Sequence, residues 1–181
     1  MAMASNLSAG QRAQRKTLIT VAAWGPVTSG TEEHRVILGT RTEDSSIEFN
    51  ADIATTTDIL GINYTDVNKT QPQQTFDPFY IMGGSTGQGV LVDYLKAAAL
   101  ENDINKYNNV FTIYIIDSTM SETVSEATSY KAYKHEGCSI IPTSIGGSDY
   151  LNMPIEVHYS NNITTGKVDK IAEDFAFTAD S

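Results

Sequence analysis

"EFNADIATTTDILGINYTDVNKTQPQQ" occupies residues 48–74, and its interpretation decides how the rest of the chain is understood. Its residues alternate as in a β-strand, in which successive side chains point to opposite faces. The even positions are Glu48, Asn50, Asp52, Ala54, Thr56 and Asp58, and the odd positions are Phe49, Ala51, Ile53, Thr55, Thr57 and Ile59. The pattern predicts one unusually long strand over residues 45–59, with one polar, acidic face and one mildly apolar face.

The second half of this stretch continues the extended pattern. Gly61 offers a turn or a bulge, and residues 62–71 remain extended until Pro72. We therefore expect either a long β-hairpin or one bent ribbon. A bulge near Gly61 would reverse the faces beyond it, so the sides taken by Asp66 and Lys69 stay open.

Composition limits the classes of protein to which the chain can belong. With 181 residues, 40% of them hydrophobic and 19% charged, it is long enough to bury the core of one domain. Twelve basic residues against 22 acidic ones give a net charge of −10, which argues against tight binding of nucleic acid. The single cysteine, Cys138, excludes an intrachain disulfide. No run approaches the ~18 apolar residues of a membrane helix, and residues 1–16 do not resemble a secretory signal, so we expect a protein made in a cytoplasm.

The chain divides into three parts. We expect residues 1–16 to form a flexible basic arm, residues 17–171 a single β-sandwich domain, and residues 172–181 an acidic tail. Frayed ends are the simpler interpretation. The alternative is that Arg12, Arg15 and Lys16 of the arm, and Glu173 and Asp174 of the tail, contact neighbouring subunits.

The remaining pattern is mainly β. Further strands are expected at residues 17–24, 34–40, 109–117, 130–146, 153–160 and 163–171, with Gly25-Pro26 ending the first and an exposed loop at 118–129. Residues 83–102 predict the only strong helix, capped by Ser85 or Thr86 and ended by Asn102. Sequential strands with one helix favour a β-sandwich or open barrel with a flanking helix and a long hairpin.

Three features invite a catalytic or metal-binding interpretation. Residues 83–87, "GGSTG", match G-x-S-x-G with Ser85 as nucleophile, but the βαβ alternation around a nucleophile elbow is missing. His135 and Cys138 supply two metal ligands where zinc needs three or four. Cys138 with His158 as its base is possible in principle, but a small core residue is the better interpretation of Cys138. We therefore expect no enzyme, no metal site and no cofactor.

Two segments carry a family resemblance. Residues 48–78, which contain "TTTDILG" (55–61) and "NKTQPQQ" (68–74), and residues 138–169 resemble the characteristic segments of major tail tube proteins of long-tailed bacteriophages, the siphophage type found in Gram-positive hosts. The resemblance spans roughly residues 45–171 and includes the helix. It is a pattern of strands and turns and contains no catalytic motif.

The resemblance implies a structural protein. Its fold would be a β-sandwich with a flanking helix, and its subunits would form hexameric rings that stack head-to-tail. Hairpins of six subunits would line a lumen through which genomic DNA passes without specific binding. The implied partners are further copies of the chain, a tape-measure protein, a tail initiator or baseplate protein and a terminator protein. The implied location is the virion tail, assembled in the host bacterial cytoplasm, with no membrane insertion by this chain.

The physical pattern agrees with this implication. Open ribbon edges can be closed by strands of neighbouring chains, and an acidic face repels a passing polyanion. We therefore expect the lumen to be faced by Glu48, Asn50, Asp52, Thr56 and Asp58. Two alternatives stay open: a monomeric β-sandwich module that binds carbohydrate or protein, and a hydrolase centred on Ser85.

Overall fold

The computed structural model describes residues 18–28, 31–39, 45–79, 87–124, 127–147 and 151–180. The strands are β1 (Leu18–Thr28), β2 (Thr31–Ile37), β3 (Ile47–Glu48), β4 (Asp52–Thr57), β5 (Asn63–Lys69), β6 (Gln73–Phe76), β7 (Phe111–Val124), β8 (Ala127–Pro142), β9 (Ile155–His158), β10 (Ile163–Val168) and β11 (Phe177–Ala179). The helices are α1 (Gln88–Leu100) and the short 3₁₀ helix η2 (Ile104–Lys106). In this described part, no helix is both long enough and apolar enough to cross a membrane.

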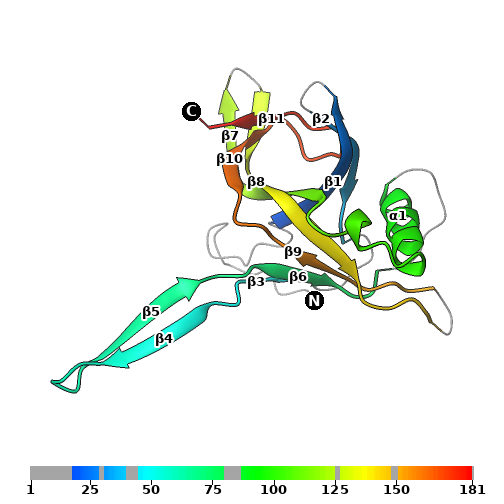
Figure 1. Cartoon of the computed structure of the whole chain (residues 1–181). Helices are drawn as coiled ribbons and strands as arrows, with labels where there is room; N and C mark the ends of the chain where they lie inside the picture. The colour runs from blue at the N-terminus through cyan, green and yellow to red at the C-terminus, as the bar shows by residue number, and fades with distance from the viewer. Residues whose placement is uncertain are drawn as a thin grey trace, which may run out of the picture.

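Strand β8 joins two antiparallel layers (Figure 1). Its first part pairs with β7 and β10 in a layer completed by β1, β2 and β11, and its last four residues pair with β9 in a layer completed by β6 and β3. The change of layer coincides with a bulge, since Phe111 pairs with Cys138 but Thr112 pairs with Glu136. The extra residue is Gly137, whose φ of 77° suits glycine. A bulge bends the strand that carries it, which is how one strand serves both layers.

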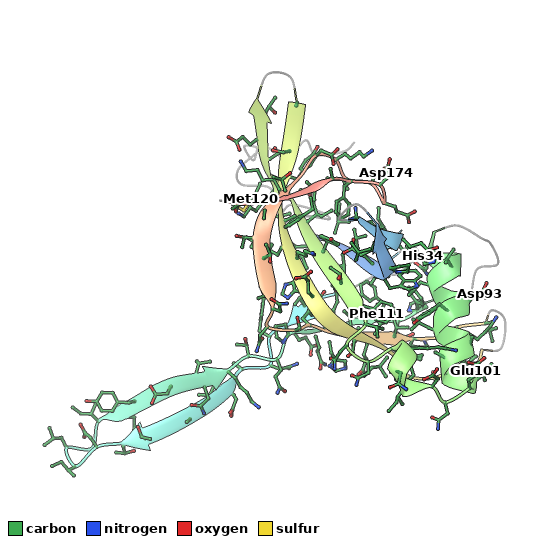
Figure 2. All side chains as sticks on the ribbon, turned by 45° about the horizontal axis from the view of Figure 1, so that its top comes forward. His34, Asp93, Glu101, Phe111, Met120 and Asp174 are labelled. Atoms are coloured by element: carbon green, nitrogen blue, oxygen red, sulfur yellow. The ribbon has the colours of Figure 1, made fainter. Side chains whose placement is uncertain are left out.

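The core fills the space between the two layers. The first layer contributes Ala22, Trp24, Val36 and Leu38, the second contributes Phe76, Ile140, Ile155 and Val157, and α1 closes one side with Leu91, Val92 and Leu95. Phe111 lies between the layer of β7 and the helix (Figure 2). The predicted fold, a mainly β sandwich with one flanking helix, is confirmed.

The helix begins later than its sequence pattern predicts. The N-cap residue is Gly87, which has no side chain to cap the helix, and Gln88 is the first helical residue. The helix is therefore capped by Gly87 and not by the expected Ser85 or Thr86, which lie outside the described residues. The predicted end is confirmed: Asn102 has a φ of 55°, and the amides of Asn102 and Asp103 bond to the carbonyls of Ala99 and Ala98. These are the two bonds of a Schellman motif with Asn at the left-handed position.

Two strand boundaries differ from expectation. Strand β1 does not end at Gly25-Pro26, because a register shift between Trp24 and Val27 accommodates both residues within its pairing to β2. Residues 118–129 are not a loop in their described part. After a shift beyond Asp117, residues 121–124 of β7 pair with residues 127–130 of β8. Backbone hydrogen bonds extend these two polar strands, and no described side chain in this region is buried.

The C-terminal segment belongs to the domain. Strand β11 pairs with β10, and Phe175 is only 2% exposed in a second apolar cluster on the outer face of β1 and β7. Gly166 of β10 permits this approach, because a Cβ there would come within 3.0 Å of the Thr178 carbonyl oxygen and the Phe177 ring. The expectation of a frayed tail over residues 172–181 is therefore wrong.

A buried polar network fastens this segment. The guanidinium of Arg35 binds the Glu32 carboxylate at 2.8 Å, donates to the Phe175 carbonyl oxygen at 2.6 Å, and lies 4.4 Å from the Phe175 ring centroid. The Tyr114 hydroxyl donates to Glu32 at 2.9 Å. Burial alone would raise the pKa of Glu32, but the hydrogen bonds from Arg35, the backbone and Tyr114, with the charge of Arg35, outweigh it and lower that pKa. Burial and the Glu32 charge raise the pKa of the Tyr114 hydroxyl.

This network predicts a specific acid sensitivity. A carboxyl whose folded pKa is lowered stabilises the fold above its unfolded pKa of about 4.3, and that contribution is lost as the pH falls through the folded pKa. We expect Glu32→Gln to lower the free energy of unfolding by about 3 kcal/mol at pH 7, because it leaves Arg35 without its carboxylate. Below the unfolded pKa of about 4.3, the variant should lose less stability with falling pH than the wild type does. Denaturant unfolding from pH 7 to pH 3 measures both effects. Glu33→Gln, at an exposed neighbour outside the network, is the control. Equal pH slopes for wild type and Glu32→Gln would contradict the assignment.

Candidate functional site

Strands β4 and β5 form a two-stranded hairpin that projects far from the body of the molecule (Figure 1). The pairing runs from Ile53↔Val67 to Thr57↔Asn63, so the long hairpin expected from the sequence is confirmed. No residue from Phe49 to Gln71 is buried. Within the described structure neither strand has a second partner, so both edges present free N–H and C=O groups.

The tip of the hairpin is held by Asp58. One carboxylate oxygen accepts the amides of Leu60 at 2.8 Å and Ile62 at 3.0 Å, and the other accepts the Tyr64 hydroxyl at 3.3 Å. Gly61 takes a φ of 77° within this turn. The bond from the Ile62 amide, with further bonds from Leu60 and Tyr64, lowers the pKa of Asp58. The carboxylate therefore organises the turn.

The turn presents apolar side chains to solvent. Ile59 is fully exposed and Leu60 is 77% exposed, and other large apolar side chains along the hairpin and its base are also exposed: Phe49, Ile53, Ile62, Tyr64 and Val67. Ile59 and Leu60 are neighbours at the tip, and exposed apolar side chains gathered in this way mark sites of interaction. The two faces differ. Ile53 and Val67 lie on one with Thr55 and Thr65, while Ala54, Thr56, Tyr64 and Asp66 lie on the other.

The base of the hairpin contains a kink at Asn50. Its φ is 42°, its side-chain amide donates to the Gln71 carbonyl oxygen at 3.3 Å, and the Gln71 amide bonds to the Phe49 carbonyl oxygen at 3.0 Å. The prediction of one unbroken strand over residues 45–59 is therefore wrong. Asn tolerates left-handed backbone better than most residues, so a single residue interrupts the alternation. Glu48 and Asp52 consequently belong to different strands, β3 and β4.

The expected lumen-facing residues occupy distinct places. Glu48 ends β3 and pairs with Gln73 on the second layer, and Asn50 forms the kink. Asp52 begins β4 opposite Lys69, beside a register shift that skips Asn68. Thr56 lies on the hairpin face that holds Tyr64, and Asp58 lies in the turn.

The expected inter-ring residues are engaged within the chain or fall outside the described part. Glu173 accepts the Ile37 amide at 3.3 Å, and Asp174, which is labelled in Figure 2, pairs with Lys170 at 2.7 Å. Arg12, Arg15 and Lys16 lie outside the described residues.

Sequence reasoning missed part of the surface that continues from the hairpin. The outer face of the second layer carries Glu48, Gln73 and His158 in one row and Thr75 and Glu156 in the next. The Glu156 carboxylate and the His158 ring are 3.3 Å apart and about 40% exposed. The alternation in "IEVH" at 155–158, apolar then polar, is the signal for this face. The apolar residues around Gly61 are the signal for the exposed tip.

The described residues hold no catalytic or metal-binding arrangement. Cys138 is buried, its thiol lies 3.4 Å from the His135 carbonyl oxygen, and burial raises the thiol pKa. His135 is buried against the Ser160 carbonyl oxygen, and burial lowers its pKa. His158 is the cross-strand partner of Ser139, but its ring is exposed on the outer face against Glu156, whereas the Cys138 side chain is buried in the core, so the two do not meet as base and nucleophile. No group of three potential ligands is close enough for a metal in the described part, and Ser85 lies outside it.

Comparison with known proteins gives faint likenesses. No family model matches the chain, and no curated protein matches it. Among solved structures, a chain of the anti-feeding prophage baseplate (cryo-EM, six-fold symmetrised) has a TM-score of 0.46 at 8% identity, over 85% of this chain and 95% of that one. A chain of the anti-feeding prophage cap, the tube-terminating cap, has a TM-score of 0.45 at 16% identity, over 91% of this chain and 98% of that one. Likeness at this level does not establish a function.

The role of Asp58 in the turn is testable. We expect Asp58→Ala to raise amide hydrogen exchange of residues 58–64 by about tenfold, because the Leu60 and Ile62 amides lose their charged acceptor. The midpoint of global unfolding should not move, since the hairpin buries no side chain. Asp66→Ala is the control, because Asp66 is on the same hairpin but its side chain makes no hydrogen bond to any described residue. Unchanged exchange at the tip in Asp58→Ala would show that the carboxylate does not hold the turn.

Proposed function

We propose that this chain is the subunit of a phage-type tail tube, in which hairpins of six copies close into a barrel around a channel for DNA. The observation that carries the proposal is the hairpin itself. It is a projecting two-stranded ribbon that buries no side chain and leaves two strand edges and a row of apolar side chains uncovered. An isolated hairpin of this kind gains little stability alone, and its edges are templates for another chain.

A ring of copies would pair the free strand edges of the hairpin and cover its exposed apolar side chains. The free edge of β5 in one copy can pair with the free edge of β4 in the next, which is strand addition between chains. The contact joins two different edges, so it is heterologous and generates a closed ring when the rotation suits. The face with Ile53 and Val67 would rest on protein, while the face with Thr56 and Asp66 would meet the channel.

The chemistry of this second face suits a passage for DNA. Its side chains are neutral or acidic, and the adjoining outer face of the second layer adds Glu48 and Glu156. DNA gains affinity when lysines and arginines replace its counterions. A wall in which Lys69 is the only described cation of the hairpin offers little such gain, so the polymer can slide. We include Glu48, Asn50, Asp52, Thr56 and Asp58 in this wall, with Asn50 and Asp58 shaping the backbone of the hairpin.

The proposal includes assembly partners. Stacked rings would meet further copies head-to-tail, a tape-measure protein inside the tube, and initiator and terminator proteins at its ends, in a virion tail built in the host cytoplasm. The basic arm with Arg12, Arg15 and Lys16 is the stronger candidate for a contact between rings. Glu173 and Asp174 would have to exchange the partners that they have within the chain.

A hairpin deletion tests this function. We expect a variant with residues 52–69 replaced by a short glycine turn to fold with wild-type thermal stability, because the core excludes the hairpin. It should remain monomeric where the wild type forms rings or hollow tubes in negative-stain images and light scattering. A second variant keeps the full hairpin but changes Ile59 and Leu60 to Ser. It distinguishes the contribution of the apolar tip to assembly from the contribution of the strand edges. Tubes formed by the deletion variant would contradict the proposal, as would a wild type that stays monomeric and binds glycans.

A further inference from the structure

Lys69 differs from the other basic residues that the structure describes. Arg35 and Lys96, Lys106, Lys131, Lys134, Lys167 and Lys170 each lie within 4.0 Å of a carboxylate oxygen in the chain. Lys69 is exposed at the base of β5 and has no such partner among the described residues. It is the one described cation on the hairpin, and the proposed function places it beside a passing polyanion.

Carboxylates at the same end of the hairpin are also unpaired. Asp52 and Asp66 are exposed and make no ion pair with any described residue. Asp52 is the cross-strand partner of Lys69, so the two residues occupy the same level of the hairpin. A single exposed pair between them would contribute little stability, because solvent screens it and both side chains lose freedom.

We propose that Lys69 is a positioning residue of the ring, where it lies between Asp52 of its own subunit and Asp52 of the next subunit and pairs with both. This inference rests on the proposed function. Rotation about a ring axis places each β5 beside the β4 of the next copy. Asp52 and Lys69 are cross-strand partners within a hairpin, and the strands of a closed barrel are staggered, so the next Asp52 is offset along the strand and the long side chain of Lys69 spans that offset. The ring then carries alternating carboxylates and ammonium groups at the hairpin base.

Such a circuit would have two consequences. It would select the register in which β5 accepts the next β4, since in other alignments Lys69 would face the uncharged residues 53–57 and lose the Asp52 carboxylate of the next subunit. It would also neutralise the lysines, so that each ring presents the DNA with no free cation from the hairpin base. A phosphate would then gain little by replacing counterions there.

Mixing two charge-reversed variants tests the inference. Lys69→Glu alone sets Glu against Asp52, and Asp52→Lys alone sets Lys against Lys69. We expect each to raise the protein concentration required for assembly by about tenfold, and we expect high salt to narrow the difference. Mixed in equal amounts, the two variants should co-assemble near the wild-type concentration, because every contact between alternating subunits again joins opposite charges. The double variant Asp52→Lys/Lys69→Glu should also assemble.

The controls separate the possible failures. Asp66→Lys makes the same charge change three residues from Lys69 but keeps Asp52, so adding it should not lower the protein concentration that Lys69→Glu requires for assembly. If the double variant assembles but the mixture of single variants does not, the ion pair lies within one subunit and the inference is wrong. Rescue of Lys69→Glu by Asp66→Lys, or unchanged assembly of Lys69→Glu alone, would also overturn it. A wild type that forms no rings would instead contradict the proposed function.

Discussion

A two-stranded ribbon in water leaves half of its backbone hydrogen-bonding groups on open edges, and this constraint governs the whole molecule. The β4–β5 hairpin has no covering layer, no buried side chain and no third strand within the described chain. Local bonds give it a definite shape: the Asp58 carboxylate at the tip and the Asn50 kink at the base. These bonds organise the ribbon but do not satisfy its edges. Another copy of the chain can supply the missing strands.

The body of the molecule is built to hold this hairpin in place. Strand β8 runs through both layers, so the layer that carries the hairpin is continuous with the layer that carries most of the core. A second link is polar: Gln74 of β6 accepts the hydroxyls of Thr20 at 2.9 Å and Tyr159 at 2.6 Å. The C-terminal segment is fastened across β1 and β7 by Arg35, Glu32 and Tyr114. These buried bonds make a rigid base from which an exposed element can be presented in one orientation.

Sequence patterns predicted what depends on local chemistry. A period of two on both sides of Gly61 indicated two extended segments, with a hairpin as one of two alternatives, and Asn102 indicated the helix end, because both depend on the backbone preferences of a few residues. The kink at Asn50 was not predictable, because alternation continues through it in the sequence and only one φ angle reverses. Strand β11 and the polar ends of β7 and β8 were missed for a different reason: long-range pairing, and not composition, makes them strands. The kink also explains the error about the acidic face of the hairpin: Glu48 and Asp52 alternate in the sequence, but they belong to different strands.

The central claim is that the hairpin forms the inner wall of an assembly. The most direct measurement is a cryo-EM reconstruction of the concentrated wild-type protein at a resolution that separates β-strands. The account predicts six-fold rings in which residues 52–69 of neighbouring copies pair edge to edge around a central channel. Rings with the hairpins on the outer surface, or with unpaired hairpin edges, would contradict it.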